Sequence, residues 1–310
     1  MSDLELIKLG GRGVSQEVRQ LLSAVFSDNT KRAYKSDLQS FLRWGGNIPS
    51  NPEEITQYIA ENCPRLSVVT LRRHISALVN IHMALELPEN PAQHSLVAKT
   101  LKGAARAHGA VQRAVKPLLI EDLRHILDLD GNTIPDHRNK ALLAIGFAGG
   151  FRRSELVALN REDIGEHPEG LLINIAKSKT DQEQVGRMVG IPYGRGPHCP
   201  VHLLLDWLRV CDVDQNAIFR GCAKGGRITD KRLSGEAVAK VVKASVARIG
   251  LNPEHYSGHS LRAGFVTSAV AAGVRTDLIR KQTGHASDHT MSRYIRDGDV
   301  FRQNAASALF

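Results

Sequence analysis

The chain has 310 residues, enough for two domains of ordinary size, and 42% of them are hydrophobic and 24% charged, which excludes a largely disordered protein. The net charge of +9 favours a polyanionic partner, because a basic side chain that binds a phosphate releases counterions. Charge alone does not separate a nucleic-acid-binding protein from a basic protein of another kind.

The first part of the chain carries helical patterns. Residues 1–15 are polar and contain glycine, so we expect a flexible N-terminal arm. Apolar residues then recur at helical spacing throughout 16–109, with no strand pattern of any length, which predicts a helical domain. The expected helices lie near 30–42, 53–59, 67–82 and 96–108.

A basic segment with few bulky apolar residues, 110–117, is expected to be a linker, and a second domain is expected at 118–310. Within it, the strand-like runs Leu171–Ile175 and Met188–Ile191 flank a charged segment and predict a β-hairpin. The expected fold class is therefore mainly α with a small β-hairpin, an α+β protein. Helices are expected at 120–129, 136–147, 201–209, 235–249, 260–272 and 276–283.

Five short motifs in the second domain carry side chains suited to phosphate chemistry. Taken singly, each has an ordinary explanation: a surface arginine after a helix, a histidine that caps a helix, or a half-buried tyrosine. Their order, which is Arg, Lys, His-x-x-Arg, Gly-His and Tyr, is what points to a function. The motifs are Gly149-Gly150-Phe151-Arg152-Arg153-Ser154-Glu155-Leu156, Ser178-Lys179-Thr180, His259-Ser260-Leu261-Arg262, Gly284-His285 and Ser292-Arg293-Tyr294-Ile295-Arg296.

This order resembles the tyrosine recombinase, or phage integrase, family over nearly the whole chain. The resemblance is most specific at Tyr256–Gly264 and at Tyr294-Ile295-Arg296, while the N-terminal part resembles the core-binding domain of the family more weakly. It implies a two-domain clamp on double-stranded DNA, made of a core-binding and a catalytic domain. It also implies site-specific DNA recombination through a covalent 3′-phosphotyrosine intermediate, without metal or ATP.

The resemblance places the phosphate-binding side chains at Arg152, Arg262 and His285. A guanidinium group binds phosphate oxygens bidentately and stays charged, so the two arginines would stabilise the charge that develops on the scissile phosphate, with a further hydrogen bond from the histidine. Glu155 is expected to orient the arginine or the histidine. Arg153 is the alternative candidate for the catalytic arginine of this motif, although the family pattern favours Arg152.

The remaining catalytic roles concern proton transfer and the nucleophile. Tyr294 is the expected nucleophile, with Tyr256 as the next candidate. Lys179 is the expected general acid for the leaving oxygen, and it is preferred to Lys177 because Ser-Lys-Thr matches the family hairpin better. His259 is the expected general base or a further phosphate contact.

Contacts to DNA are expected from two helices of the first domain, with a solvated helix face as the alternative reading of each. The opposite face of the principal helix, with Leu71, Ile75 and Leu78, is expected to pack in the core. The candidate contacts are Thr70, Arg72, Arg73 and His74 on the principal helix, and Lys31, Arg32 and Lys35 at the start of another.

The chain is expected to act as a homotetramer on two DNA sites, because cutting both strands of two duplexes needs four nucleophiles. Residues 297–310, which include Phe301, Leu309 and Phe310, are expected to form a tail that packs on a neighbouring subunit. The alternatives are a resolvase, a nicking-closing enzyme resembling type IB topoisomerases, or a DNA-binding regulator without catalysis.

Four cysteines without a C-x-x-C pair, no secretory leader and no apolar run of ~20 residues predict a cytoplasmic, nucleoid-associated protein with no membrane partner. His198, Cys199 and His202 form one cluster of potential metal ligands. No second cluster completes a tetrahedral site, so we expect the start of a helix there, and neither a metal nor another cofactor.

Overall fold

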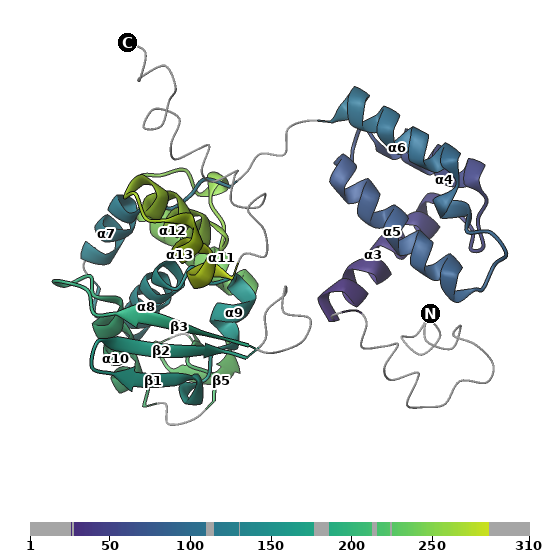
Figure 1. Ribbon diagram of the computed structural model, residues 1–310. Coiled ribbons are helices and arrows are strands. Elements are labelled where there is room, and N and C mark those ends of the chain that lie inside the picture. The colour runs from purple at the N-terminus through teal and green to yellow at the C-terminus, as the bar shows by residue number, and fades with distance from the viewer. Residues whose placement is uncertain are drawn as a thin grey trace, which may run out of the picture. The chain divides into compact units, whose positions relative to one another are not determined.

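The computed structural model describes residues 26, 28–109, 115–129, 131–176, 186–212, 216–223 and 225–284. The chain divides into two compact units, Met1–Arg113 and Ala114–Phe310, and each is a separate body with its own core (Figure 1). The expected arm at 1–15, most of the expected linker and the expected tail at 297–310 lie outside the described residues.

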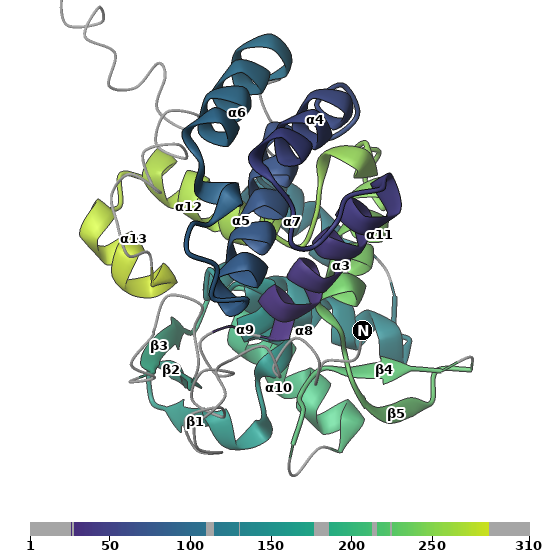
Figure 2. The same ribbon diagram turned by 90° about the vertical axis from the view of Figure 1, so that its right-hand side faces the viewer.

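The first unit is helical, as the sequence predicts. Asn51 and Ser67 cap two of its helices, each accepting a hydrogen bond from the backbone nitrogen three residues ahead. The apolar faces of the helices meet in one core around the fully buried Phe41, Tyr58 and Leu71. Figure 2 shows the helices of this unit in a second view. Its elements are α3 (Asp28–Trp44), α4 (Pro52–Asn62), α5 (Val68–Ala84), the 3-10 turn η1 (Pro91–Gln93) and α6 (Ser95–His108).

A buried polar network joins three helices of this core. His74 on α5 contacts Tyr58 of α4 (Oη to Nδ1, 2.7 Å) and Asp37 of α3 (Nε2 to Oδ1, 3.1 Å). Arg73 adds two hydrogen bonds of 2.7 Å to the same carboxylate. Desolvation lowers the pKa of His74, and this favours a neutral ring that donates from Nε2 and accepts at Nδ1.

Replacing Tyr58 with phenylalanine is expected to destabilise the first unit by about 1–3 kcal/mol, because the ring stays packed while Nδ1 of His74 loses its donor in the core. Urea unfolding followed by tryptophan fluorescence, to which the neighbouring Trp44 contributes, measures the change. The matched control is Tyr193→Phe, which alters an exposed tyrosine and should leave the unfolding midpoint unchanged. Equal midpoints for Tyr58→Phe and wild type would show that the hydrogen bond adds nothing.

The second unit combines helices with two small antiparallel sheets. The predicted hairpin is confirmed, because β2 pairs with β3 in a register that places Leu171 opposite Ile191 and Ile173 opposite Val189. The structure adds three strands that the sequence did not predict: β1 extends the hairpin to the order β1-β2-β3, and β4 pairs with β5. The strands are β1 (Ile164–His167), β2 (Gly170–Ile175), β3 (Arg187–Pro192), β4 (Arg220–Cys222) and β5 (Ile228–Arg232).

Helix α8 lies at the centre of the second unit, where it packs against α10 and α12 (Figure 1). Residues 141–147 of this helix are buried on every face, and Gly149 caps its C-terminus. The motif that follows does not extend α8, since a separate short helix begins at Arg153. The helices are α7 (Ile120–Asp128), α8 (Ile134–Ala148), α9 (Arg153–Ala158), α10 (Pro200–Cys211), α11 (Gly235–Arg248), α12 (Ser260–Ala271) and α13 (Thr276–Thr283), with 3-10 turns η2 (Arg161–Asp163) and η3 (Pro253–His255).

The three potential metal ligands at the start of α10 have separate environments. His198 pairs with Asp128 at 2.6 Å, Cys199 is buried and accepts from the backbone of Gly194, and the His202 ring lies beside Tyr193. Among the described residues, no group of three His, Cys, Asp or Glu side chains is arranged to hold a metal ion. Within the same ranges, no helix is both long and apolar enough to cross a membrane.

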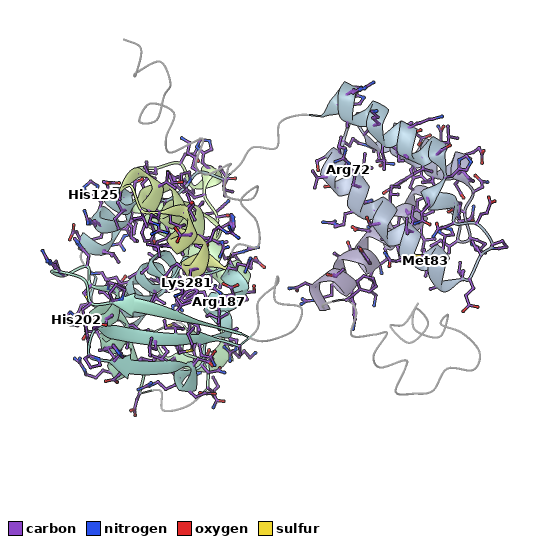
Figure 3. All side chains as sticks on the ribbon, viewed as in Figure 1. Arg72, Met83, His125, Arg187, His202 and Lys281 are labelled. Carbon is purple, nitrogen blue, oxygen red and sulfur yellow. The ribbon has the colours of Figure 1, made fainter. Side chains whose placement is uncertain are left out.

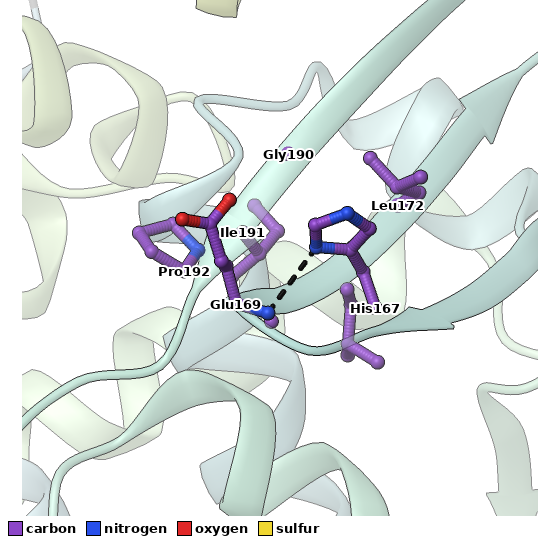
Figure 4. Close-up of a pocket in the computed structure, with 8 residues that line it drawn as sticks. His167, Glu169, Leu172, Gly190, Ile191 and Pro192 are labelled. Atoms are coloured by element: carbon purple, nitrogen blue, oxygen red, sulfur yellow. Dashed lines mark hydrogen bonds between the residues drawn. The ribbon is translucent and has the colours of Figure 1, made fainter.

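A shallow surface pocket of about 220 Å³ lies at the turn between β1 and β2, where His167 Nδ1 accepts a hydrogen bond from the backbone of Glu169 (Figure 4). Its walls come from the end of the sheet where Gly170 pairs with Pro192. Arg187 lies at the other end of β3, so this pocket is separate from the arginine cluster described next.

Candidate active site

Arg152 is presented by the turn between α8 and α9. Gly150 has a φ of +56°, which suits a glycine, and it lets the chain reverse against Thr283. Glu155 then holds Arg152 twice, accepting from its backbone nitrogen at 3.0 Å and from Nη1 at 2.6 Å. The carboxylate side chain is only 1% exposed, whereas the Arg152 side chain keeps 18% of its surface in contact with solvent.

Arg262 lies one turn into α12 and is almost fully buried, with 1% of its surface exposed. Its Nη1 atom donates to the backbone oxygens of Gly150, at 2.8 Å, and Thr283, at 2.6 Å. The guanidinium group therefore lies between the turn that presents Arg152 and the end of α13.

Arg187, at the start of β3, is a third arginine of this site, and it lies in none of the five motifs. Its Nη2 atom pairs with the second carboxylate oxygen of Glu155 at 2.9 Å, and its Nη1 atom donates to the Gln282 carbonyl. Figure 3 shows Arg187 beside the end of α13, near Lys281. The sequence marks Arg187 only as a single basic residue at the start of an apolar strand. The partner strand in the hairpin is the one that leads to Lys179.

The three arginines meet at the C-terminus of α13. Three consecutive carbonyls there accept hydrogen bonds from three different elements. The Gln282 carbonyl accepts from Arg187, the Thr283 carbonyl accepts from Arg262, and the Gly284 carbonyl accepts from Arg152 at 3.3 Å. The last carbonyls of a helix lack intrahelical partners and carry partial negative charge, so cations stabilise this end. The next residue, His285, is outside the described ranges.

Positive charge exceeds negative charge among these side chains, since three arginines meet at the end of α13 and the carboxylate of Glu155 pairs with two of them, Arg152 and Arg187. Burial alone would raise the pKa of Glu155. The backbone hydrogen bond from Arg152 and the charges of Arg187 and Arg152 outweigh burial and lower it, so the group is an anion at neutral pH. The cluster therefore favours an additional anion with several acceptor oxygens, such as a phosphate.

His259 lies immediately before α12, one turn from Arg262. Its side chain is exposed at the surface, yet partial desolvation lowers its pKa, and the charges of Arg262, Arg153 and Arg152 lower it further. A neutral imidazole at pH 7 can accept a proton, which suits the expected role as a general base.

The structure favours Arg152 over Arg153 as the site arginine. Arg153 is exposed, and its aliphatic part lies so close to Gly258 that a Cβ atom there would overlap Arg153 Cδ. The alternative nucleophile Tyr256 is buried, and burial raises the pKa of its hydroxyl, which makes the phenolate harder to form. Four residues with expected or alternative roles lie outside the described ranges: Lys177, Lys179, His285 and Tyr294.

The candidate DNA contacts of the first unit occupy different environments. Arg72 projects from α5 with an exposed side chain (Figure 3). Thr70 is half-buried in the cap of α5, and Arg73 pairs with Asp37. The expectation that His74 lies on the surface is wrong, because the residue is 4% exposed and belongs to the core network. Lys31 and Arg32 are exposed and Lys35 is half-buried.

The second unit is thus a helical framework with a small sheet, and it carries a cluster of three arginines at the end of α13 whose charge suits a phosphate-like anion. Residues 116–299 match the phage integrase family. The chain is 34% identical over 306 residues to an integrase/recombinase xerD homolog of Selenomonas ruminantium, covering 96% of this chain and 90% of that one. It is also 25% identical over 297 residues to a tyrosine recombinase of Thermosipho africanus, covering 91% and 94% of the two chains.

Solved structures share the fold. A lambda integrase fragment, residues 75–356, bound to DNA superposes with a TM-score of 0.64 at 16% identity and covers 98% of this chain and 99% of that one. The XerH site-specific recombinase bound to a palindromic difH substrate superposes with a TM-score of 0.63 at 21% identity, covering 83% and 72%. The chain belongs to the phage integrase family of tyrosine site-specific recombinases.

Proposed function

We propose that this protein recombines DNA at specific sites, by cutting each strand with Tyr294 and rejoining it through a covalent 3′-phosphotyrosine, without metal or ATP. The observation that carries the proposal is the cluster of three arginines at one helix end, with a single carboxylate among them. Membership of the tyrosine recombinase family supports it.

In the proposed reaction, Arg152 and Arg262 bind the nonbridging oxygens of the scissile phosphate and stabilise the charge that grows in the transition state. The phenolic oxygen of Tyr294 attacks phosphorus, and the bond from phosphorus to the 5′ oxygen breaks. Lys179 donates the proton that the leaving oxygen takes up, and His259 accepts the proton of the phenol. His285 adds a hydrogen bond to the phosphate.

Because the phosphotyrosine bond replaces the phosphodiester that breaks, its free energy remains available for rejoining. Attack by a 5′ hydroxyl on phosphorus then restores the DNA strand and releases the tyrosine. The proposed chemistry thus needs no ATP.

The proposed grip on DNA uses both units, as a core-binding domain at 16–109 and a catalytic domain at 118–310, joined by a basic linker at 110–117. In the core-binding domain, Arg72 is the exposed side chain that we favour for a contact in a groove. Two duplexes cut on both strands need four tyrosines, so we propose a tetramer on paired sites in which the tail at 297–310 packs on a neighbour. The phosphate contacts proposed are Lys31, Arg32 and Lys35.

Incubating the protein with a nicked suicide substrate is expected to give a covalent protein–DNA adduct, because the leaving fragment diffuses away and blocks rejoining. The adduct should form equally well in EDTA, since arginine side chains supply the charge that a metal would otherwise provide. Denaturing gel electrophoresis measures the yield. A DNA-binding regulator would give no adduct, and a yield that disappears in EDTA and returns with magnesium would contradict the proposed chemistry.

A further inference from the structure

Arg187 connects three elements that carry proposed catalytic residues. It begins β3, in the hairpin whose connecting segment includes Lys179. Its guanidinium group pairs with Glu155, which holds Arg152, and it donates to the Gln282 carbonyl at the end of α13, three residues before His285. One side chain therefore contacts two of these elements and belongs to the third.

The charge of Arg187 changes the net charge of the group of side chains around Arg152. Glu155 divides its two carboxylate oxygens between the guanidinium groups, with Oε1 toward Arg152 at 2.6 Å and Oε2 toward Arg187 at 2.9 Å. The trio therefore carries a net positive charge, whereas Arg152 and Glu155 alone would cancel. The Arg187 and Glu155 side chains are 17% and 1% exposed, so water screens these charges weakly.

Close packing holds the Arg187 guanidinium against the end of α13. A Cβ atom at Gly284 would lie 2.9 Å from Arg187 Nε, so a larger residue there would displace the Arg187 side chain, and the φ of +66° also suits glycine. The Gln282 side chain ties the same turn to the carbonyls of Ala148, at 3.1 Å, and Gly190, at 3.2 Å. The end of α13 is thus held against β3 by side-chain-to-backbone hydrogen bonds in both directions, from Arg187 to Gln282 and from Gln282 to Gly190.

From this geometry we propose that Arg187 is a positioning residue for DNA strand cleavage: it shares Glu155 so that Arg152 keeps its positive charge toward the phosphate, and it fixes the end of α13. The inference rests on the proposed recombinase function. The residue acts through Arg152 and α13, since its own terminal nitrogens bind Glu155 and Gln282. Loss of Arg187 should therefore slow cleavage more than it weakens DNA binding.

Two substitutions separate charge from geometry. Arg187→Lys keeps the charge and loses the planar fork, and Arg187→Gln loses both. With protein in excess over a suicide substrate, we expect the single-turnover cleavage rate to fall ~10-fold for lysine and ~100-fold for glutamine, the scale of a misplaced catalytic group. The Kd for a half-site and the Tm should remain close to those of the wild type.

The matched controls are Arg209→Lys and Arg209→Gln, which alter an arginine that is 77% exposed and pairs with Asp206 on α10. These variants should cleave at the wild-type rate. A second measurement places Arg187→Gln in a Glu155→Gln background, where no carboxylate anion remains to be shared. In that background, Arg187→Gln should slow cleavage much less than it does in the wild type, because Arg187 and Glu155 act as one unit.

Three outcomes would overturn the inference while the wild type still forms adducts. The first is an Arg187→Gln variant that cleaves at the wild-type rate. The second is a loss of cleavage that is fully accounted for by a matching fall in Tm and DNA binding, which would mean that Arg187 only stabilises the fold. The third is an equal loss of cleavage rate when Arg187→Gln is introduced into the wild type and into the Glu155→Gln variant. If the wild type itself forms no adduct, the proposed function fails, and this inference fails with it.

Discussion

A Tyr294→Phe variant is expected to bind its DNA site with the affinity of the wild type and to form no covalent protein–DNA adduct. The substitution removes one oxygen atom, which is the proposed nucleophile, and leaves the cationic cluster of Arg152, Arg187 and Arg262 unchanged. Adduct yield on a suicide substrate measures the chemistry, and a gel shift at the same salt concentration measures binding.

The control for this variant is Tyr256→Phe. Tyr256 is buried, and burial raises the pKa of its hydroxyl, so the structure disfavours it as a nucleophile, and its variant should form adducts at the wild-type level. Adducts that persist in Tyr294→Phe and vanish in Tyr256→Phe would transfer the nucleophile role to Tyr256. Adducts that persist in both variants would rule out both residues.

Local sequence rules predict the regular elements well. The helices expected at 120–129 and 276–283 occur as Ile120–Asp128 and Thr276–Thr283, because apolar spacing and helix-ending residues act within a few positions. The strands Arg220–Cys222 and Ile228–Arg232 carry no such signal, since three to five residues around a glycine turn are too few to show a periodic pattern.

The site shows the same division between local and long-range information. The motifs identify Arg152, Glu155 and Arg262, and the structure brings these three side chains to the same helix end. Arg187 lies in no such motif, because its role depends on contacts with residues 32 positions before it and 95 positions after it. Only the tertiary structure brings β3 to the end of α13.

His74 shows where a short-range pattern misleads. It directly follows Arg72 and Arg73, and this run of basic residues predicts a basic surface. Its position three residues after Leu71 and four before Leu78 places it on the apolar face of α5, by the same periodicity that identified the core. Its partners Asp37 and Tyr58 come from two other helices, so the sequence did not reveal how a polar ring is accommodated there.

Replacing Arg152 with alanine is expected to slow strand cleavage by ~100- to 1,000-fold, equivalent to about 2.7–4 kcal/mol of transition-state stabilisation, the range for the loss of one oxyanion donor. The fold should survive, because Glu155 keeps its ion pair with Arg187 and its hydrogen bond from the backbone nitrogen of residue 152. Single-turnover cleavage of a suicide substrate measures the rate, and circular dichroism checks the fold.

The neighbouring Arg153→Ala variant is the matched control, because it removes the same charge one residue away. Arg153 is exposed and lies against Gly258, and its charge helps to lower the pKa of His259, so its loss should raise that pKa and change the cleavage rate only slightly. The ratio between the two variants tests the assignment directly. If Arg153→Ala proves the more sensitive, Arg153 contacts the phosphate and the alignment of this motif shifts by one residue.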